Sequence, residues 1–277
     1  MNDITVEIQG GLGNQLFQIF ALVSCSVDNK IDFYLEKRDI LHGHRTKTYW
    51  NDFLMGFRKF LRKPVRVHKV RETNFHYSPI KLPKKPDNIK LWGYFQSHKY
   101  FQHNKQHIYK LLQLWRYKKQ LRDQVKFNPD DYCSLHFRIG DFANIQNYHP
   151  VMSFKYYQFA LDKLIKMTKR DNWQILYFYE YKDNDKVNKV LKQLQKKYPK
   201  LRFQPVNHQL TDWQQLLLMS LCQHNIIANS TFSWWGAYFN QHQDKLIFYP
   251  KRWFGPDYRN KSTKDLFPSR WNSINGN

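Results

Sequence analysis

The stretch His136-Phe137-Arg138-Ile139-Gly140-Asp141 decides how the rest of this chain is interpreted. It follows residues 132–135, a short apolar run typical of a buried strand. Gly140 can end such a strand in a backbone conformation that other residues avoid. His136 and Arg138 would then emerge together at the carboxyl end of a strand, where open α/β sheets bind ligands. Arg138 suits a phosphate or carboxylate partner, but an Arg138–Asp141 pair that braces the turn is an equal alternative.

The composition describes a folded and strongly basic chain. Its 277 residues are 42% hydrophobic and 17% aromatic, which suffices for one large packed domain or two medium ones. The formal net charge of +23 favours an anionic small substrate, a nucleic acid or an anionic membrane surface, and charge alone does not choose among them. The 3 cysteines have no pairing or metal-ligand spacing, so we expect reduced core thiols and a reducing compartment.

No stretch resembles a targeting or membrane-spanning segment. Residues 4–8 alternate as a first strand, and the apolar run at 216–219 is far too short to cross a bilayer. We therefore expect a cytoplasmic chain. Residues 58–71 are densely basic, which is usually a solvated face. The alternative is a docking patch for an acidic acceptor or an anionic membrane, which would make the chain membrane-peripheral.

A glycine-rich turn follows the first strand. Gly10, Gly11 and Gly13 allow a tight turn and a close approach of the backbone to a ligand. The helix expected after them can present free N–H groups to an anion. A Rossmann dinucleotide site is a weak interpretation, because the third glycine of that motif is replaced by leucine. Asn14 and Gln15 instead suit hydrogen bonds to a specific ligand.

The rest of the pattern alternates strands with helices. We expect strands at residues 31–35, 91–97, 174–179, 201–203, 225–228 and 245–250. We expect one helix to bury a stripe made of Ile108, Leu111, Leu112 and Trp115. A polar break near residues 127–130 divides the pattern in two, which predicts an α/β fold with two domains of parallel sheets covered by helices. The predicted domains are residues 1–128 and 129–277, with the last residues able to pack back on the first domain.

A second strand-to-helix turn, residues 229–237, is rich in hydroxyl groups. Ser230, Thr231 and Ser233 supply more hydroxyls than helix capping requires. Together with backbone N–H groups at the start of the helix, the spare hydroxyls can hold a phosphate.

These stretches resemble the α-1,2-fucosyltransferases of glycosyltransferase family 11. The resemblance rests on residues 10–18, 136–141 and 226–237, with support from 93–97 and 249–253, in the family's order. It implies a GT-B architecture in which two Rossmann-like domains face a central cleft, with the acceptor on the first and GDP-fucose on the second. It also implies an inverting fucosyltransferase that joins L-fucose to a hydroxyl of a glycan acceptor, as an α-1,2 linkage to a galactose-like residue, without a metal or other cofactor.

Carried over by position, the resemblance assigns roles to single residues. Arg138 would grip the donor diphosphate and stabilise the charge of the leaving group, with His136 beside it. The other residues expected near the donor phosphates are Asn229, Ser230, Thr231 and Ser233. The residues expected on the acceptor side are Gly11, Gly13, Asn14 and Gln15, with Asn14 facing the reaction centre. Asp141 is the nearest carboxylate that could act as a general base, but it can equally orient Arg138 or stabilise the turn.

One departure from the family pattern bears on the donor. Tyr179-Glu180-Tyr181 stands where members often carry Ser-Asp-Asp. Glu180 would supply the acid toward the nucleotide, and the selectivity for base and sugar stays open. The nearest alternative function is therefore a transferase of the same fold that uses another GDP-linked or related deoxyhexose.

Other classes of protein are less well supported. A metal-dependent GT-A transferase would use Asp183 and Asp185 as its D-x-D motif, but that motif lies in a Lys-rich polar segment. A nucleic-acid-binding protein would explain the charge, yet the basic residues are spread along the chain and no nucleic-acid motif is present. We therefore expect no metal site and no specific nucleic-acid partner. A lectin-like relative without turnover is disfavoured by the presence of Arg138 and Asn14.

Overall fold

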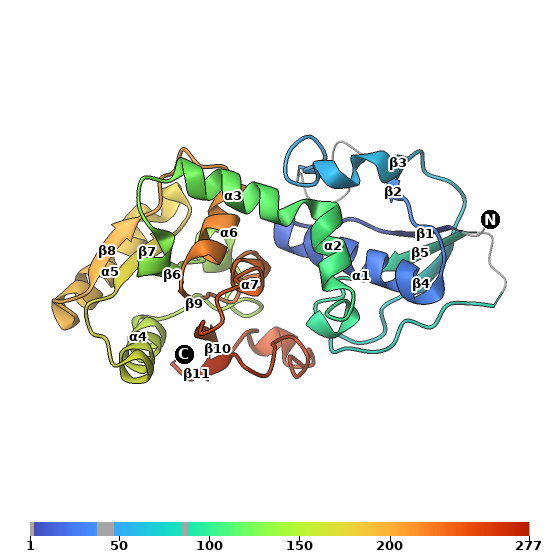
Figure 1. Ribbon diagram of the computed structural model, residues 1–277. Coiled ribbons are helices and arrows are strands. Elements are labelled where there is room, and N and C mark those ends of the chain that lie inside the picture. The colour runs from blue at the N-terminus through green and yellow to red at the C-terminus, as the bar shows by residue number, and fades with distance from the viewer. Residues whose placement is uncertain (1–2, 38–46, 85–87, 277) are drawn as a thin grey trace. The chain divides into compact units, whose positions relative to one another are not determined.

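The computed structural model describes residues 3–37, 47–84 and 88–276 (Figure 1). The chain divides into two compact units, Met1–Tyr117 with Lys261–Pro268, and Lys118–Asn260 with Ser269–Asn277. The division falls inside helix α3 (Leu114–Gln124), ahead of the polar break at 127–130. The domain limits predicted from that break stay a prediction. Each unit is described by itself below.

The first unit is built on short parallel strands. Its main sheet has the order β1-β5-β4, and β2 and β3 form a separate parallel pair. These strands are β1 (Asp3–Val6), β2 (Leu35–Glu36), β3 (Leu61–Arg62), β4 (His68–Arg71) and β5 (Asn88–Trp92). The helical segments are α1 (Leu12–Asn29), η1 (Met55–Phe60), η2 (His98–Tyr100) and α2 (Lys105–Leu112). The core forms around α1, because Phe17 and Phe20 are fully buried and their rings lie 6.0 and 5.3 Å from that of Phe101.

The second unit holds a six-stranded sheet in the order β11-β10-β9-β6-β7-β8, with every neighbouring pair parallel. The strands are β6 (Tyr132–His136), β7 (Gln174–Phe178), β8 (Arg202–Pro205), β9 (His224–Ile226), β10 (Ile247–Pro250) and β11 (Asn272–Ile274). Counted along this unit, that is the order 3-2-1-4-5-6 of doubly wound nucleotide-binding sheets. The order reverses between β6 and β9, and such sheets bind ligands beside the reversal, at the carboxyl ends of the strands.

Helices connect these strands. They are α4 (Phe154–Thr168), α5 (Asn184–Lys197), α6 (Asp212–Leu221) and α7 (Thr231–Tyr238), with short turns η3 (Pro129–Asp131), η4 (Gly140–Asn144), η5 (Tyr181–Asp183) and η6 (Pro256–Tyr258). Ser153 caps α4, because its hydroxyl accepts the N–H of Tyr156 at 3.3 Å. Helices and parallel strands therefore alternate along this unit, as the sequence pattern predicted.

Three elements expected from the sequence are wrong in detail. The single helix with a buried stripe is two helices, because Gln113 adopts a left-handed φ of 57° and ends α2, and Trp115 on α3 is 68% exposed. The strand expected over residues 91–97 ends at Trp92, and Phe95 has a positive φ of 51°. The strand expected over 31–35 reduces to β2 and one parallel bridge between Phe33 and Ile4.

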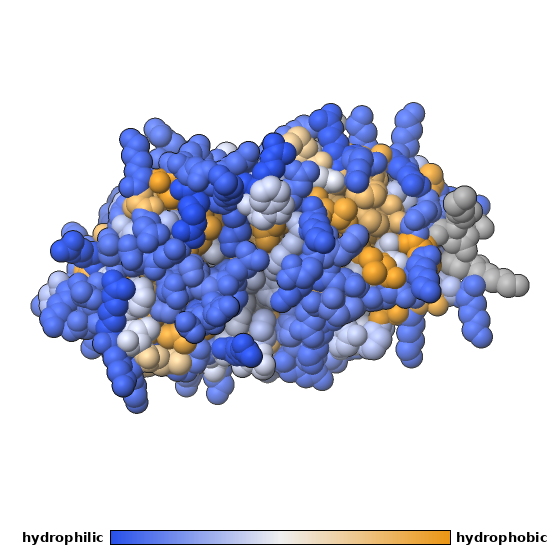
Figure 2. All heavy atoms as spheres, in the orientation of Figure 1, coloured by the Kyte–Doolittle hydropathy of each residue, from blue (hydrophilic) through white to orange (hydrophobic). Residues whose placement is uncertain are grey.

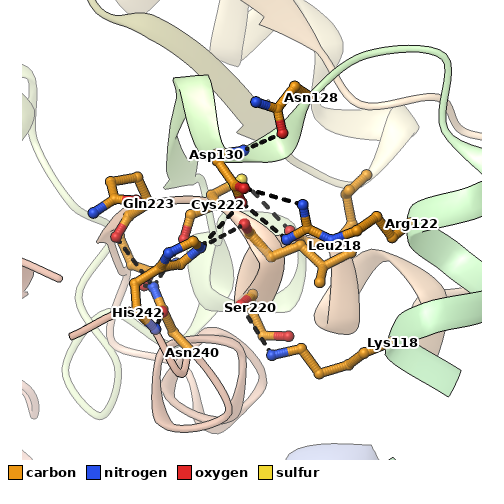
Figure 3. A network of polar contacts seen from close by, with 12 residues as sticks. Lys118, Arg122, Asn128, Asp130, Leu218, Ser220, Cys222, Gln223, Asn240 and His242 are labelled. Atoms are coloured by element: carbon orange, nitrogen blue, oxygen red, sulfur yellow. Dashed lines mark hydrogen bonds and ion pairs between the residues drawn. The ribbon is translucent and has the colours of Figure 1, made fainter. Parts of the chain in front are cut away.

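A polar network fixes the carboxyl-terminal part of α3 within the second unit (Figure 3). The buried Lys118 ammonium donates to the carbonyls of Ser220 at 3.3 Å and Phe239 at 3.0 Å, which close α6 and α7. Arg122 pairs with both carboxylate oxygens of Asp130, at 2.9 and 3.1 Å. Burial lowers the pKa of Lys118 to about 8. A cation here offsets the partial negative charge of two helix ends.

The surface is mainly hydrophilic on the face shown in Figure 2. Within the part of the chain that the structure describes, no helix is both long and apolar enough to cross a membrane. The cysteines are unpaired and buried, which confirms the expected core thiols.

Contacts within the first unit engage part of the basic segment 58–71. Arg62 pairs with Asp3, and the side chains of Lys69 and Arg71 lie over the ring of Trp92, at 4.6 and 4.9 Å. Docking of this segment on an anionic membrane stays a prediction.

Candidate active site

Strand β6 places the six residues His136–Asp141, here called the hexad, at the carboxyl edge of the six-stranded sheet. The strand ends at His136, and Gly140 has the positive φ expected of it, at 35°. Phe137 and Ile139 are buried in the apolar core, which anchors the turn. The N–H of Gly140 donates to the carboxylate of Asp183 at 2.7 Å. The fold thus buries the neighbours of Arg138 while leaving its own side chain 25% exposed.

Arg138 is held between two carboxylates. It forms ion pairs with Glu180 and with Asp141, and its guanidinium lies 4.9 Å from the ring centre of Phe142. Glu180 also pairs with Lys182 at 2.7 Å. Burial alone would raise the pKa of Glu180, but the Lys182 and Arg138 cations together hold it below its ordinary value. The brace that the sequence allowed between Arg138 and Asp141 is therefore present, and Glu180 adds to it.

The hydroxyl-rich turn at residues 229–237, which the sequence predicts to bind the donor phosphates, lies beside the hexad. Its strand, β9, neighbours β6 at the reversal of strand order, and the ring centres of His136 and Phe232 are 5.7 Å apart. Ser230 caps α7 by accepting the N–H of Phe232 at 3.3 Å, and Thr231 begins the helix. The topology thus places Arg138 and the start of α7 at one edge of one sheet, where anions bind readily.

Two other residues of the turn at 229–237 are buried. Asn229 is 2% exposed, and its amide donates to the carbonyls of Pro150 at 2.9 Å and Trp253 at 3.1 Å. Ser233 is fully buried, and its hydroxyl lies 3.4 Å from the carbonyl of Ala228. These contacts hold the shape of the turn, whereas Ser230 and Thr231 are only half-buried.

The surroundings of His136 favour the neutral form of its imidazole. Burial and the Arg138 cation lower its pKa to about 3. Its Nδ1 is buried and has no hydrogen-bond partner among the described residues. The hydroxyl of Tyr157 donates to the carbonyl of His136 at 3.0 Å and fixes the end of the strand.

In the first unit, the glycine-rich turn lies at the carboxyl end of β1. Gly10 has a φ of +77°, Gly11 is the residue before α1, and Gly13 is buried in the first turn of that helix. Gln15 is completely buried, and its amide donates to the carbonyls of Gly10 at 3.0 Å and Lys47 at 2.9 Å. Gln15 therefore fixes the form of the turn from the inside.

Asn14 reaches a neighbouring turn, residues 93–97. Its side-chain oxygen accepts a hydrogen bond of 3.0 Å from the amide of Gln96. The carboxylate of Glu72 accepts the N–H groups of Tyr94 at 2.8 Å and Phe95 at 3.1 Å, which holds the backbone of that turn. Neither Glu72 nor Gln96 was singled out as a site residue from the sequence, where only the resemblance of residues 93–97 to the family marked this region.

Among the residues that the structure describes, no three His, Cys, Asp or Glu side chains are grouped so that they could hold a metal ion. The D-x-D alternative required Asp183 and Asp185. Asp183 is 6% exposed and accepts the N–H of Gly140, while Asp185 lies in the first turn of α5. The first of these carboxylates is thus committed to the hexad turn.

Known proteins were compared with this chain. The sequence model of glycosyl transferase family 11 matches residues 44–275. This chain belongs to glycosyl transferase family 11. It is 25% identical over 296 residues to an alpha-1,2-colitosyltransferase of Escherichia coli, with 98% of each chain covered. It is 31% identical over 139 residues to the O-antigen biosynthesis glycosyltransferase WbnK of Escherichia coli, which covers 48% of this chain and 42% of WbnK.

Solved structures support the fold of this family-11 glycosyltransferase. Escherichia coli ADP-heptose LPS heptosyltransferase II gives a TM-score of 0.50 at 10% identity, covering 99% of this chain and 90% of that protein. The predicted α/β class with GT-B architecture is confirmed. The GT-B architecture decides against the GT-A alternative, and the family model supports a glycosyltransferase.

Proposed function

We propose that this family-11 enzyme transfers L-fucose from GDP-fucose to a hydroxyl of a glycan acceptor, with inversion, without a metal ion, and with an α-1,2 linkage to a galactose-like residue. One observation carries the proposal. Arg138 and the start of α7 both follow strands at the reversal of a doubly wound sheet, where a diphosphate would bind. A full-length relative named for α-1,2 transfer of colitose, another deoxyhexose, supports the linkage and the class of donor sugar.

In this proposal Arg138 exchanges a carboxylate partner for the donor diphosphate. The bond between the anomeric carbon and the phosphate oxygen breaks, and its electron pair stays on that oxygen. Arg138 stabilises the new charge more in the transition state than in the bound donor, which lowers the barrier. Ser230 and Thr231 bring the first N–H groups of α7 to the phosphates, while Asn229 and Ser233 shape their turn from within.

The acceptor hydroxyl attacks the opposite face of the sugar and loses its proton to a base. Asp141 is the proposed base: it is bound to Arg138 in the free enzyme, and the incoming diphosphate would release it. On the acceptor side, Gln96 holds the side-chain oxygen of Asn14, so the amide nitrogen of Asn14 is the group left to donate to the sugar. Glu180 sets the charge around Arg138 and faces the donor.

A donor screen tests this function. The enzyme is incubated with GDP-fucose, GDP-colitose and a UDP-hexose, each with a galactose-terminated acceptor, with and without EDTA. We expect GDP release and product from GDP-fucose, undiminished by EDTA, with the linkage assigned as α-1,2 by NMR. Preference for the UDP-sugar, or loss of activity in EDTA, would contradict the proposal. Preference for GDP-colitose would keep the mechanism and replace the donor by another GDP-deoxyhexose.

A further inference from the structure

The second unit has a pocket at the end of its sheet opposite to the hexad. Its volume is about 470 Å³, and its lining is formed by Arg170, Asn172, Gln174, Pro199, Lys200 and Arg202. Gln174 and Arg202 are the first residues of β7 and β8 and are partners in register, so the pocket lies at the amino ends of these strands. Glu180 and the hexad follow the carboxyl ends of β7 and β6. The pocket is therefore separate from the proposed donor site.

Arg170 is held in place for binding. Its Nε donates to the side-chain oxygen of Asn172 at 3.0 Å, and its guanidinium lies 4.1 Å from the ring centre of Trp173. That ring is itself fixed, because Trp173 is 5% exposed and its indole N–H donates to Thr168 at 3.0 Å. A guanidinium that is stacked and held through Nε keeps its terminal N–H groups for a ligand and loses less conformational entropy on binding.

The charges around the pocket are unbalanced. Among the described residues, the side chains of Arg170 and Arg202 form no ion pair with an acid, and Lys200 pairs with Asp171 at 2.8 Å. Both members of that pair are largely exposed, so little is lost when the ammonium turns to another anion. The lining thus carries two guanidinium groups and one ammonium, and of these cations the ammonium alone has an acidic partner among the described residues. The proposed donor site is more balanced in charge, since Arg138 there forms ion pairs with two carboxylates.

Cations at helix ends are ordinary, because they offset the partial negative charge of the last carbonyls. That effect accounts for Lys196 and Lys197 in the last turn of α5. It does not account for Arg170, Lys200 and Arg202, which follow the ends of α4 and α5 and converge on one concavity.

We propose that this pocket binds a phosphate-bearing ligand. Arg170 and Arg202 would each grip phosphate oxygens with two N–H groups, Lys200 would add a point charge, and the amides of Asn172 and Gln174 would complete the lining. The same chemistry fits a free phosphate compound or the headgroup of an anionic lipid. A lipid headgroup would attach this unit to a membrane by the edge away from its proposed donor site.

The first test measures binding of inorganic pyrophosphate to enzyme saturated with GDP, which fills the proposed donor site. The indole N–H of Trp173, assigned with the W173F variant, reports on the pocket in ¹H–¹⁵N spectra. We expect a saturable shift and an affinity at least about tenfold lower in the R170Q/R202Q variant. The matched control is K189Q/K192Q, which removes the same charge from exposed positions of α5 and should bind as the wild type. No saturable shift, or equal loss in the control, would overturn the proposal.

The second test separates the two sources of phosphate. Flotation with phosphatidylglycerol vesicles is compared with flotation on phosphatidylcholine vesicles, for the wild type and both double variants. Binding to the anionic vesicles that pyrophosphate displaces and R170Q/R202Q loses would identify a lipid headgroup. Pyrophosphate binding without vesicle binding would identify a free phosphate compound. Vesicle binding that both variants retain, without pyrophosphate binding, would place membrane contact elsewhere on this basic chain and refute the pocket.

Discussion

Replacing Glu72 by alanine should release the turn at residues 93–97 and destabilise the first unit. The Glu72 carboxylate accepts the N–H groups of Tyr94 at 2.8 Å and of Phe95 at 3.1 and 3.2 Å. Each donor left without a partner costs about 1–3 kcal/mol. Phe95 also holds a left-handed φ of 51°, which adds about 1 kcal/mol of strain that the carboxylate helps to maintain. The two donors together cost about 2–6 kcal/mol and relief of the Phe95 strain returns about 1 kcal/mol, so we expect the free energy of unfolding to fall by about 1–5 kcal/mol.

Urea unfolding at several pH values measures this effect. Burial raises the pKa of Glu72 above its ordinary value of 4.5. The folded state therefore binds the Glu72 proton more tightly than the unfolded state does. The resulting stabilisation is fully present below pH 4.5 and is lost as the pH rises through the folded-state pKa of Glu72. Glu72→Gln keeps one acceptor and should remove this pH dependence. Asp123→Ala, which breaks an exposed ion pair with Lys119, is the matched control and should change stability by less than about 0.5 kcal/mol.

A loss in Glu72→Ala no larger than in the Asp123→Ala control would refute the reasoning, because the carboxylate would then not support the turn. The same turn carries Gln96, which holds Asn14. Under the proposed function, Gln96→Ala should lower kcat for transfer while GDP affinity, which depends on the second unit, stays unchanged.

Further predictions concern the second unit. Lys118→Ala should cost about 1–3 kcal/mol in urea unfolding, since two carbonyls at the ends of α6 and α7 lose their donor. Because the folded pKa of Lys118 is lowered to about 8 from 10.5, stability of the wild type relative to this variant should rise with pH across that window. Glu180→Gln should change GDP affinity about two- to fivefold in titration calorimetry, as expected for one partly exposed charge beside Arg138; no change would remove Glu180 from the site. The pH profile of kcat should show no limb from His136 between pH 5 and 8, since its pKa is about 3, and His136→Asn should leave the profile's shape intact.

The sequence pattern predicted the second unit well, for a physical reason. Its strands β6 and β7 are almost fully buried and read as apolar runs, as at residues 132–135, and its turns are marked by Gly140 and by the cap Ser230. Parallel pairing then decides which turns meet. The pairing of β6 with β9 places Arg138 beside the turn that follows Ile226, although nothing local in the sequence encodes that neighbourhood.

The first unit was predicted less well, because its strands are short and partly exposed. β3 and β4 lie within the basic segment 58–71 and lack an apolar run. Periodicity predicts a buried Trp115, because it cannot show that Gln113 interrupts the helix with a left-handed residue. The sequence predicts a strand over residues 91–97 that runs past Trp92, because the hydrogen bonds that the Glu72 carboxylate accepts from the following turn depend on tertiary structure.

The candidate site shows the same limit. From the sequence, Asp141 is the acidic partner suggested for Arg138, because it lies three residues away. The pair with Glu180 joins the ends of neighbouring strands and could be located only once their register was known. Likewise, the sequence predicts both the Ser230 and the Ser233 hydroxyls near the donor phosphates, because spacing alone does not reveal that Ser233 turns into the core.

Arg138→Ala tests the central claim most directly, with Arg122→Ala as its matched control. Both variants remove an arginine that pairs with acidic side chains in the second unit, but Arg122 pairs with Asp130 in the α3 network (Figure 3). Transfer from GDP-fucose is measured for each, with urea unfolding to confirm that both are folded at the assay temperature. We predict that kcat/KM falls at least about a hundredfold in Arg138→Ala and less than about threefold in Arg122→Ala. Equal activities in the two variants would show that Arg138 only braces its turn and would contradict its role at the departing GDP.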